Sequence, residues 1–177
     1  TKACELEDTF YLYWLRLGEM KFITGQDPEP ELKKALNLSP EDPWTLNQYG
    51  LYLLDKGDYK EAKDYFSRAL EKAPSEEDIA INFSQSLYKL GQTGEAFKVC
   101  ETEVFSNKPG IFNHRGNLYT QANDYHRAVT EYTKALDLDP ENPVYLENCA
   151  KACIEVDMIM QAEEYLTKLF DISPTAS

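Results

Sequence analysis

The stretch KALNLSPEDP (residues 34–43) returns almost unchanged as KALDLDPENP (134–143), and a third, shorter copy begins RAL at residue 68. The three copies lead to Pro40, Pro74 and Pro140, and a fourth proline, Pro174, follows, so that successive prolines are 34, 66 and 34 residues apart. The middle interval therefore holds two copies that together lack two residues. A period of this length predicts a chain built from stacked, repeated supersecondary units.

Small, aromatic and proline residues recur at fixed places inside this unit. One set returns 66 residues later as a second: Gly50, Tyr59, Ala62, Phe66, Ala69 and Pro74, then Gly116, Tyr125, Ala128, Tyr132, Ala135 and Pro140. A small residue is needed where two helices cross closely, and an aromatic side chain fills the space beside it. Proline ends the second helix because it cannot donate the next backbone hydrogen bond. The pattern predicts pairs of antiparallel helices.

This pattern resembles the tetratricopeptide repeat, which has Gly or Ala at position 8, Ala at 20, an aromatic residue at 24, Ala at 27 and Pro at 32. The resemblance covers about three quarters of the chain. It implies an all-α fold, a right-handed superhelical solenoid of antiparallel helix pairs, with four repeats plus an irregular N-terminal helical cap.

The repeats divide the chain into five segments. Residues 1–42 form a degenerate N-terminal repeat or cap, 43–76 and 109–142 are close matches, and 143–177 hold a repeat and the C-terminal end. Residues 77–108 are a degenerate repeat, with Ser84 and Cys100 at two diagnostic places. The expected helices are 10–23, 31–38, 44–56, 59–72, 77–90, 93–105, 110–122, 125–138, 143–156 and 159–172.

The composition narrows the classes of partner. Eighteen Lys and Arg stand against 31 Asp and Glu, a net charge of −13, which repels nucleic acid and anionic membrane surfaces. No apolar run is long enough to insert into a membrane. We expect a protein or peptide partner. The charge favours a basic one, although carboxylates on solvated helix faces explain it equally well.

The sequence offers few candidate catalytic or metal-binding residues. Cys149 and Cys153 are spaced like half a metal site, but they occupy positions that pack in the core, so we expect no metal. His114 and His126 lack an acidic or serine partner at a recognisable spacing. We therefore expect no catalytic residue, no cofactor and no enzymatic activity. The cysteine usage suggests a reducing compartment, and a cytoplasmic location is expected unless a targeting segment lies outside these residues.

In the family that this chain resembles, the first helix of each repeat lines a concave groove. Carried onto this sequence, the resemblance gives these candidate partner-binding residues: Asn47, Gln48, Asn82, Gln85, Asn113, His114, Asn117, Asn148 and Lys151. The other side chains that it places in the groove are Trp44, Leu51, Ile81, Lys89, Gln121, Glu147 and Glu155. Asn and Gln each offer a donor and an acceptor, so they can bind the backbone of an extended peptide. We expect these side chains to face solvent. Polar residues merely tolerated on a wet helix face are the alternative interpretation.

The sequence thus predicts a non-enzymatic protein–protein interaction module that binds a partner peptide or segment in its groove. Two alternatives stay open. The chain is a structural assembly scaffold that docks through its terminal helices, or it is the targeting module of a larger multidomain protein. The apolar last helix, with Leu166 and Phe170, favours self-association through that helix.

Overall fold

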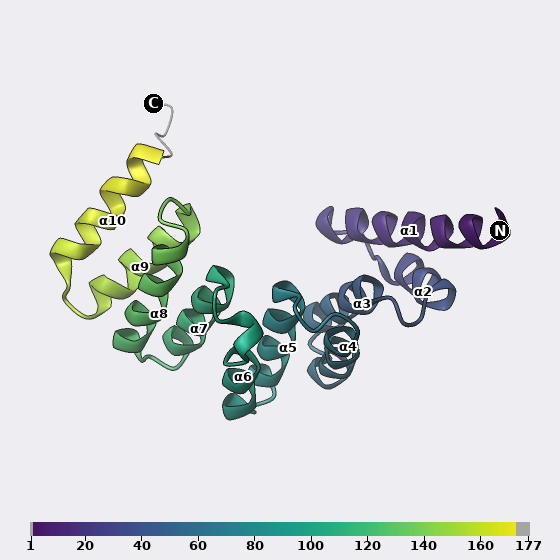
Figure 1. Cartoon of the computed structure of the whole chain (residues 1–177), viewed down its shortest axis with the longest axis horizontal. Coiled ribbons are helices and arrows are strands. Elements are labelled where there is room, and N and C mark those ends of the chain that lie inside the picture. The colour runs from purple at the N-terminus through teal and green to yellow at the C-terminus, as the bar shows by residue number, and fades with distance from the viewer. Residues whose placement is uncertain (1, 173–177) are drawn as a thin grey trace. The chain divides into compact units, whose positions relative to one another are not determined.

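The computed structural model describes the backbone of residues 2–172 and the side chains of residues 10–172. Within that part of the chain all regular structure is helical (Figure 1). The elements are α1 (Lys2–Ile23), α2 (Glu29–Leu38), α3 (Pro43–Lys56), α4 (Tyr59–Lys72), α5 (Glu77–Lys89), α6 (Thr93–Cys100), the 3-10 helix η1 (Glu103–Phe105), α7 (Pro109–Gln121), α8 (Tyr125–Leu138), α9 (Pro143–Glu155) and α10 (Ile159–Ile172). The prediction for Pro174 lies outside the described residues.

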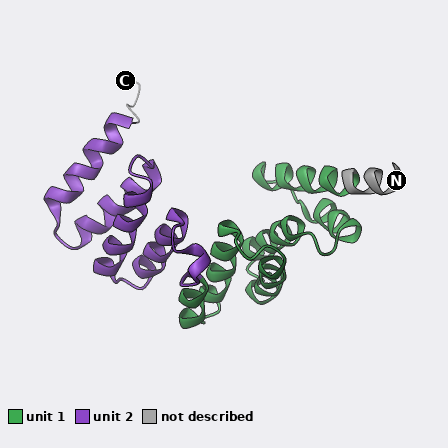
Figure 2. Cartoon of the chain, viewed as in Figure 1, with its two compact units in different colours: residues 1–99 green, residues 100–177 purple. Residues whose placement is uncertain are grey.

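The helices form two compact units, residues 1–99 and residues 100–177 (Figure 2). In unit 1, α1 packs on α2 and α3 on α4, and α4 also contacts α5. In unit 2, α7 packs on α8 and α9 on α10, and α8 also contacts α9. Each unit is therefore a row of helix pairs, and the predicted all-α fold of paired helices is confirmed.

The repeated stretches around residues 40 and 140 carry the signals that start the next helix. The Asp42 carboxylate accepts a hydrogen bond from the backbone N–H of Thr45 at 2.7 Å, and Pro43 occupies the first turn of α3. Asn142 caps α9 in the same way, accepting from the backbone N–H of Val144 at 3.1 Å. A side-chain cap satisfies N–H groups that have no partner inside the helix. These contacts explain why the stretch recurs with so little change.

The glycines of the repeat mark the points where paired helices cross. A Cβ atom built on Gly50 would lie 2.6 Å from the Phe66 ring, and one on Gly116 would lie even closer to the Tyr132 ring. Both aromatic side chains are buried. The recurrence of glycine and an aromatic residue therefore reflects direct contact between the helices of a pair.

The first helix pair is more regular than the sequence indicated. The first helix begins at Lys2 rather than Phe10, and the second begins at Glu29 rather than residue 31. A Cβ atom on Gly18 would lie 2.7 Å from a Leu32 methyl carbon, so α1 and α2 cross as the later pairs do. A leucine in place of the aromatic residue, 14 rather than 16 residues after the glycine, hid this relationship in the sequence.

The degenerate repeat differs from the prediction at its second helix. We expected one helix over 93–105, but α6 ends at Cys100 and is followed by the separate turn of η1, where Phe105 is buried. Ser84 replaces the crossing glycine and donates a hydrogen bond from its hydroxyl to the Ala96 carbonyl at 2.9 Å. This bond lets the buried hydroxyl sit where Gly50 and Gly116 have no side chain.

The cysteines whose side chains are described pack in the interior. Cys100, Cys149 and Cys153 are buried, which confirms the prediction that they are core residues. Burial disfavours the thiolate and raises the pKa of Cys153 to about 12. The side chain of Cys4 lies outside the described part. None of the helices among the described residues has the length and apolar character needed to cross a membrane.

Candidate functional site

Asparagine pairs join neighbouring first helices in both units. In unit 1 the Asn82 side-chain amide of α5 donates to Asn47 Oδ1 of α3 at 3.0 Å. In unit 2 the Asn148 amide of α9 donates to Asn113 Oδ1 of α7 at 2.9 Å. The two bonds are equivalent, because each runs from position 6 of one repeat to position 5 of the repeat before it. Each unit thus carries the same amide pair on the face formed by its first helices, here called its first-helix face.

These amide pairs keep part of their hydrogen-bonding capacity. Asn82 and Asn148 each donate one N–H, and within the described residues their Oδ1 atoms make no hydrogen bond. Both side chains are half-buried, so their oxygens lie at the edge of the solvent. Such an oxygen can accept a hydrogen bond from a ligand without breaking the pair.

Not every predicted site residue faces solvent. Asn47 is 4% exposed and His114 is 5% exposed, so the expectation of solvent-facing side chains is wrong for these two. Burial lowers the pKa of His114 to about 4, and its imidazole is neutral at pH 7. Lys151 is exposed, and the other predicted site residues are half-buried: Gln48, Asn82, Gln85, Asn113, Asn117 and Asn148.

A cavity of about 330 Å³ opens on the first-helix face of unit 2, between α7, α9 and the aromatic side chains of α8. It brings together three of the predicted residues, Asn117, Asn148 and Lys151. Its full lining is Asn117, Thr120, Tyr125, Tyr132, Asn148, Lys151, Ala152 and Glu155. The predicted residues Asn47, Gln48, Asn82 and Gln85 belong to unit 1 instead.

A hydroxyl network forms one wall of this cavity and orients Asn117. The Tyr132 hydroxyl donates to Asn117 Oδ1 at 2.8 Å, and Thr120 Oγ1 lies 3.1 Å from the same Tyr132 oxygen. Because the tyrosine proton is used on Asn117, the Thr120 hydroxyl is left to donate to Tyr132. The Asn117 NH₂ group makes no hydrogen bond to any described residue, so it can donate to a ligand. Burial raises the pKa of Tyr132, which keeps its proton in place.

Sequence reasoning missed Thr120, Tyr125 and Tyr132 as site residues. Both tyrosines were explained by the aromatic positions of the repeat, and Tyr132 does pack against Gly116. The signal available was the difference between the two close repeats, because unit 1 has Phe66 where unit 2 has Tyr132. Only the tyrosine has a hydroxyl that can donate a hydrogen bond to an asparagine side chain on the first helix.

The charged groups around the cavity differ in whether they have an ion-pair partner. Lys151 Nζ lies 2.6 Å from Glu147 Oε1 one turn earlier in α9, so its charge is already paired. Glu155, one turn later, is exposed and makes no ion pair within the part of the chain that the structure describes. The carboxylate of Glu155 is the uncompensated charge at this site.

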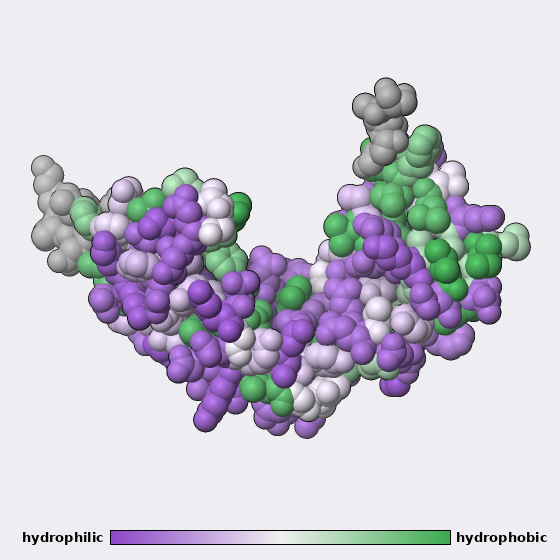
Figure 3. All heavy atoms as spheres, turned by 180° about the vertical axis from the view of Figure 1, so that it is seen from behind, coloured by the Kyte–Doolittle hydropathy of each residue, from purple (hydrophilic) through white to green (hydrophobic). Residues whose placement is uncertain are grey.

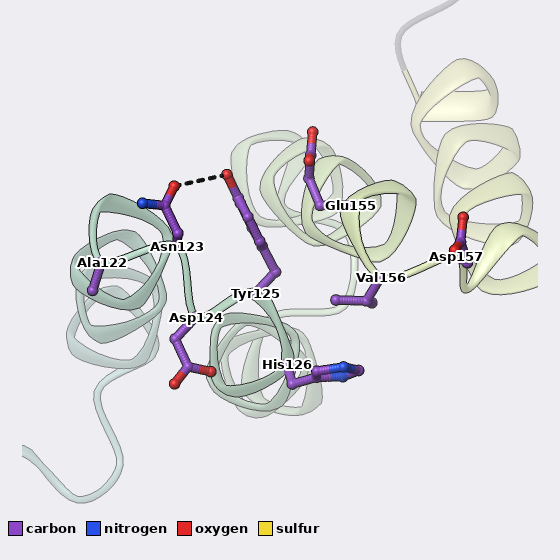
Figure 4. A pocket seen from close by; sticks show the side chains of 8 residues that line it. All are labelled: Ala122, Asn123, Asp124, Tyr125, His126, Glu155, Val156 and Asp157. Atoms are coloured by element: carbon purple, nitrogen blue, oxygen red, sulfur yellow. Dashed lines mark hydrogen bonds between the residues drawn. The ribbon is translucent and has the colours of Figure 1, made fainter.

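A second cavity, of about 550 Å³, adjoins the first and shares Tyr125 and Glu155 with it (Figure 4). It lies between the turns that follow α7 and α9, and it is lined by Ala122, Asn123, Asp124, Tyr125, His126, Glu155, Val156 and Asp157. The Tyr125 hydroxyl donates to Asn123 Oδ1 at 3.3 Å. The ring of Tyr125 therefore forms the boundary between the two cavities.

The helix pairs and their glycine crossings define a helical-repeat protein. Family models described as tetratricopeptide repeat match residues 31–64 and 53–102, and one described as TPR repeat matches residues 116–154. The chain belongs to the tetratricopeptide-repeat family.

Known proteins similar to this chain support the assignment. A TPR repeat-containing protein of Treponema pallidum (strain Nichols) is 25% identical over 182 residues, which cover 99% of this chain and 22% of the relative. The chain thus spans about a fifth of that relative's length. Two solved structures share the fold. A thermophilic TPR protein of Thermus thermophilus has a TM-score of 0.78 and 18% identity, covering 94% of this chain and 93% of its own. YrrB, described as a TPR protein with an unusual peptide-binding site, has a TM-score of 0.57 and 22% identity, covering 99% and 93%.

Proposed function

We propose that the first-helix faces of this chain bind an extended segment of a partner protein, with the unit 2 cavity as the main contact, and that the chain does no chemistry itself. Membership of the tetratricopeptide-repeat family supports a protein–protein interaction module in general. The observation that carries the more specific proposal is the cavity lined by Asn117 and Asn148, whose amides keep an unused donor and an unused acceptor.

These groups suit a peptide backbone. The Asn117 NH₂ can donate to a backbone carbonyl, and Asn148 Oδ1 can accept from a backbone N–H. Each such bond contributes about 0.5–1.5 kcal/mol, whereas micromolar affinity needs about 8 kcal/mol. Side-chain contacts in the cavity must supply the rest. YrrB, which has the same fold, is described as having a peptide-binding site, and this lends the proposal support by analogy.

The absence of chemistry is also part of the proposal. His114, the predicted site residue best suited by type to act as a base, is buried and neutral. The acidic net charge argues against nucleic acid as the partner. A targeting role within a longer protein is compatible with the same face, because the chain matches only a fraction of its relative's length.

Affinity capture with the whole chain tests the proposal. The Asn117→Ala/Asn148→Ala double variant should lose partners that the wild-type chain retains, as measured by quantitative mass spectrometry. Asn37→Ala/Gln161→Ala is the matched control, because both of these amides are exposed and lie on second helices. If the double variant remains folded and retains the same partners as the control, the first-helix face is not the binding site.

A second candidate function is assembly through the last helix. Leu166 and Phe170 of α10 are 44% and 62% exposed, whereas Tyr132 and Leu136 at the same repeat positions of α8 are 2% and 7% exposed. Figure 3 shows apolar residues gathered over α10. The corresponding face of α8 is covered by α9. We propose that the apolar face of α10 is likewise covered by a helix, and that this helix belongs to a second copy of the chain.

Sedimentation over a range of concentrations tests this assembly. The wild-type chain should form dimers or larger species, and Phe170→Glu should shift it to monomer. Thr167→Glu adds the same charge to the same helix without removing apolar surface, so it should associate like wild type or only slightly less. A strictly monomeric wild-type chain would remove this candidate.

A further inference from the structure

The wall that separates the two unit 2 cavities combines an aromatic ring with a free carboxylate. Tyr125 at the start of α8 and Glu155 at the end of α9 line both cavities. In Figure 4 the side chains of Tyr125 and Glu155 point in a similar direction, and that of His126 extends to one side of them. The hydrogen bond from the Tyr125 hydroxyl to Asn123 restrains the ring. A ligand entering here meets a π face and a negative charge together.

The remaining polar atoms of the cavity add an acceptor. Asn148 Oδ1 is unused in its pair with Asn113, whereas Asn117 Oδ1 already accepts from Tyr132. Asp157 contributes a further carboxylate to the adjoining cavity. Acceptors with full or partial negative charge are thus presented by α9 and by the turn that follows it.

The cations near the site are already paired. Lys151 lies against Glu147 at 2.6 Å, and Arg127 forms an ion pair with Asp124 at the start of α8. Over residues 100–177 the sequence has 13 Asp and Glu against six Lys and Arg. Both the local arrangement and the charge of the whole unit therefore attract a cation.

We infer that the unit 2 cavity binds the side chain of an arginine or lysine in the partner segment. This inference rests on the proposed function and names the chemistry that the site selects. The cationic group lies over the Tyr125 ring, forms an ion pair with Glu155 and donates to Asn148 Oδ1. Arginine fits better than lysine, because its planar guanidinium can stack on the ring while two of its N–H groups bond the carboxylate.

An acidic side chain is the opposite alternative. Lys151 and the Asn117 NH₂ could both donate to a carboxylate. However, Lys151 has Glu147 one turn before it and Glu155 one turn after it on α9. An incoming carboxylate would meet two negative charges for one positive charge. We therefore favour the basic ligand and use the acidic one as an arm of the test.

Titration of the whole chain with short capped peptides tests the inference. The probes are acetyl-Gly-Arg-Gly-amide, its citrulline analogue, which has nearly the same shape without the charge, and acetyl-Gly-Glu-Gly-amide. Chemical-shift changes of the Asn117 and Asn148 side-chain amides in NMR spectra report occupancy of the cavity. We expect saturable shifts with the arginine peptide in the millimolar range, binding at least fivefold weaker with citrulline, and weakening as salt rises.

Two matched variants test whether the Glu155 carboxylate is the charge that binds the arginine peptide. Glu155→Gln should weaken binding of the arginine peptide about three- to tenfold while keeping the shape of the side chain. Glu163→Gln removes a carboxylate of α10 that is also exposed but lies outside the cavity, and it should leave the affinity unchanged. Thermal melting curves of both variants should match that of the wild type, which excludes unfolding as the cause.

The inference is overturned by any of three results: arginine and citrulline peptides binding equally, Glu155→Gln binding like wild type, or the glutamate peptide binding more tightly than the arginine peptide. These results differ from failure of the proposed function. If natural partners are lost with Asn117→Ala/Asn148→Ala but do not respond to Glu155→Gln, the face still binds a protein segment and only its basic specificity is wrong.

Discussion

The side-chain amide of Asn148 donates to Asn113 Oδ1 over 2.9 Å, so a residue expected to face solvent instead links two first helices. Replacing Asn148 with alanine removes this bond and leaves a half-buried acceptor on Asn113. We predict that Asn148→Ala lowers the free energy of unfolding by about 1 kcal/mol, measured by urea denaturation. Solvent-facing asparagines would predict almost no change.

A double-mutant cycle separates the pair from other effects of truncation. Asn113→Ala and the double variant complete the cycle, and the coupling between the two positions should be about 0.5–1 kcal/mol. A coupling of zero would show that the two amides stabilise the fold independently. The same cycle on Asn47 and Asn82 should give a similar value, because their bond is 3.0 Å long.

The crossing glycines give a second prediction. A methyl group on Gly116 would overlap the Tyr132 ring, and one on Gly50 would lie 2.6 Å from Phe66, so neither ring can stay in place. We predict that Gly116→Ala and Gly50→Ala each destabilise the protein by about 1–3 kcal/mol.

Gly94 provides the matched control for this substitution. It lies in α6, and a Cβ atom there would have no neighbour within 4 Å. Gly94→Ala should therefore stabilise the protein by up to about 1 kcal/mol, since alanine is favoured over glycine in a helix. Thermal melting of the three variants checks the contrast. Equal effects at all three positions would mean that helix propensity, and not helix crossing, governs these glycines.

The sequence predicted most helices to within one or two residues because their boundaries are local. Pro43 and the Asp42 cap start α3 whatever surrounds them, and Pro143 with Asn142 does the same for α9. What it missed depends on contacts between segments. The pairing of Asn113 with Asn148 joins residues 35 apart, and it is set by how closely two helices approach. The residue pattern of a single repeat does not specify how closely its first helix approaches that of the next repeat.

The burial of His114 could not be predicted for the same reason. Its position in the repeat corresponds to that of Gln48, which is half-buried, yet His114 is 5% exposed. The end of α6 at Cys100 was missed because residues 77–108 keep Ala96 but lack the aromatic residue and the second alanine that mark the second helix elsewhere. Irregular repeats are where sequence periodicity loses its predictive power.

The low pKa of His114 predicts a pH dependence of stability. Above pH 6.5 the imidazole is neutral in both the folded and the unfolded chain. Between 6.5 and the folded pKa of about 4, the unfolded chain binds a proton that the folded chain does not, so stability falls as the pH falls. From pH 7 to pH 5 this linkage amounts to about 2 kcal/mol.

Urea denaturation at pH 7 and pH 5 measures the effect. His114→Gln should lose most of the difference between the two pH values, whereas His126→Gln, at an exposed position, should keep it. Carboxylates such as Glu41, whose pKa is lowered by hydrogen bonds from Lys72 and Arg68, respond mainly at lower pH. If the His114 variant keeps the full difference, its imidazole is accessible in the folded chain.

The buried thiols should be unreactive in the folded protein. The thiolate is the reactive form, and burial raises the pKa of both Cys149 and Cys153. In a Cys4→Ser background, we predict that Ellman's reagent labels the native chain at less than about 1% of the rate seen in denaturant. All three remaining thiols should react after unfolding. Rapid labelling of one thiol in the native chain would show that its helix pair opens readily.

The Tyr132 hydroxyl provides the sharpest test of how the unit 2 cavity is organised. Tyr132→Phe keeps the ring that packs on Gly116, as Phe66 packs on Gly50, and removes only the donor to Asn117. We predict a loss of stability of about 1 kcal/mol, because the hydroxyl bonds both Asn117 and Thr120. The Asn117 side chain should then rotate more freely about its Cβ–Cγ bond, and its two N–H signals should sharpen and shift in NMR spectra.

Partner binding should weaken with this change although no charge and no exposed group is lost. Tyr59→Phe is the matched control, since Tyr59 is a tyrosine of unit 1 at the position that corresponds to Tyr125 and does not orient Asn117. We expect Tyr132→Phe to reduce partner affinity about threefold to tenfold and Tyr59→Phe to leave it nearly unchanged. Equal affinities for the two variants, alongside a clear loss with Asn117→Ala, would mean that the ligand itself orients the Asn117 amide and that the hydroxyl network serves only stability.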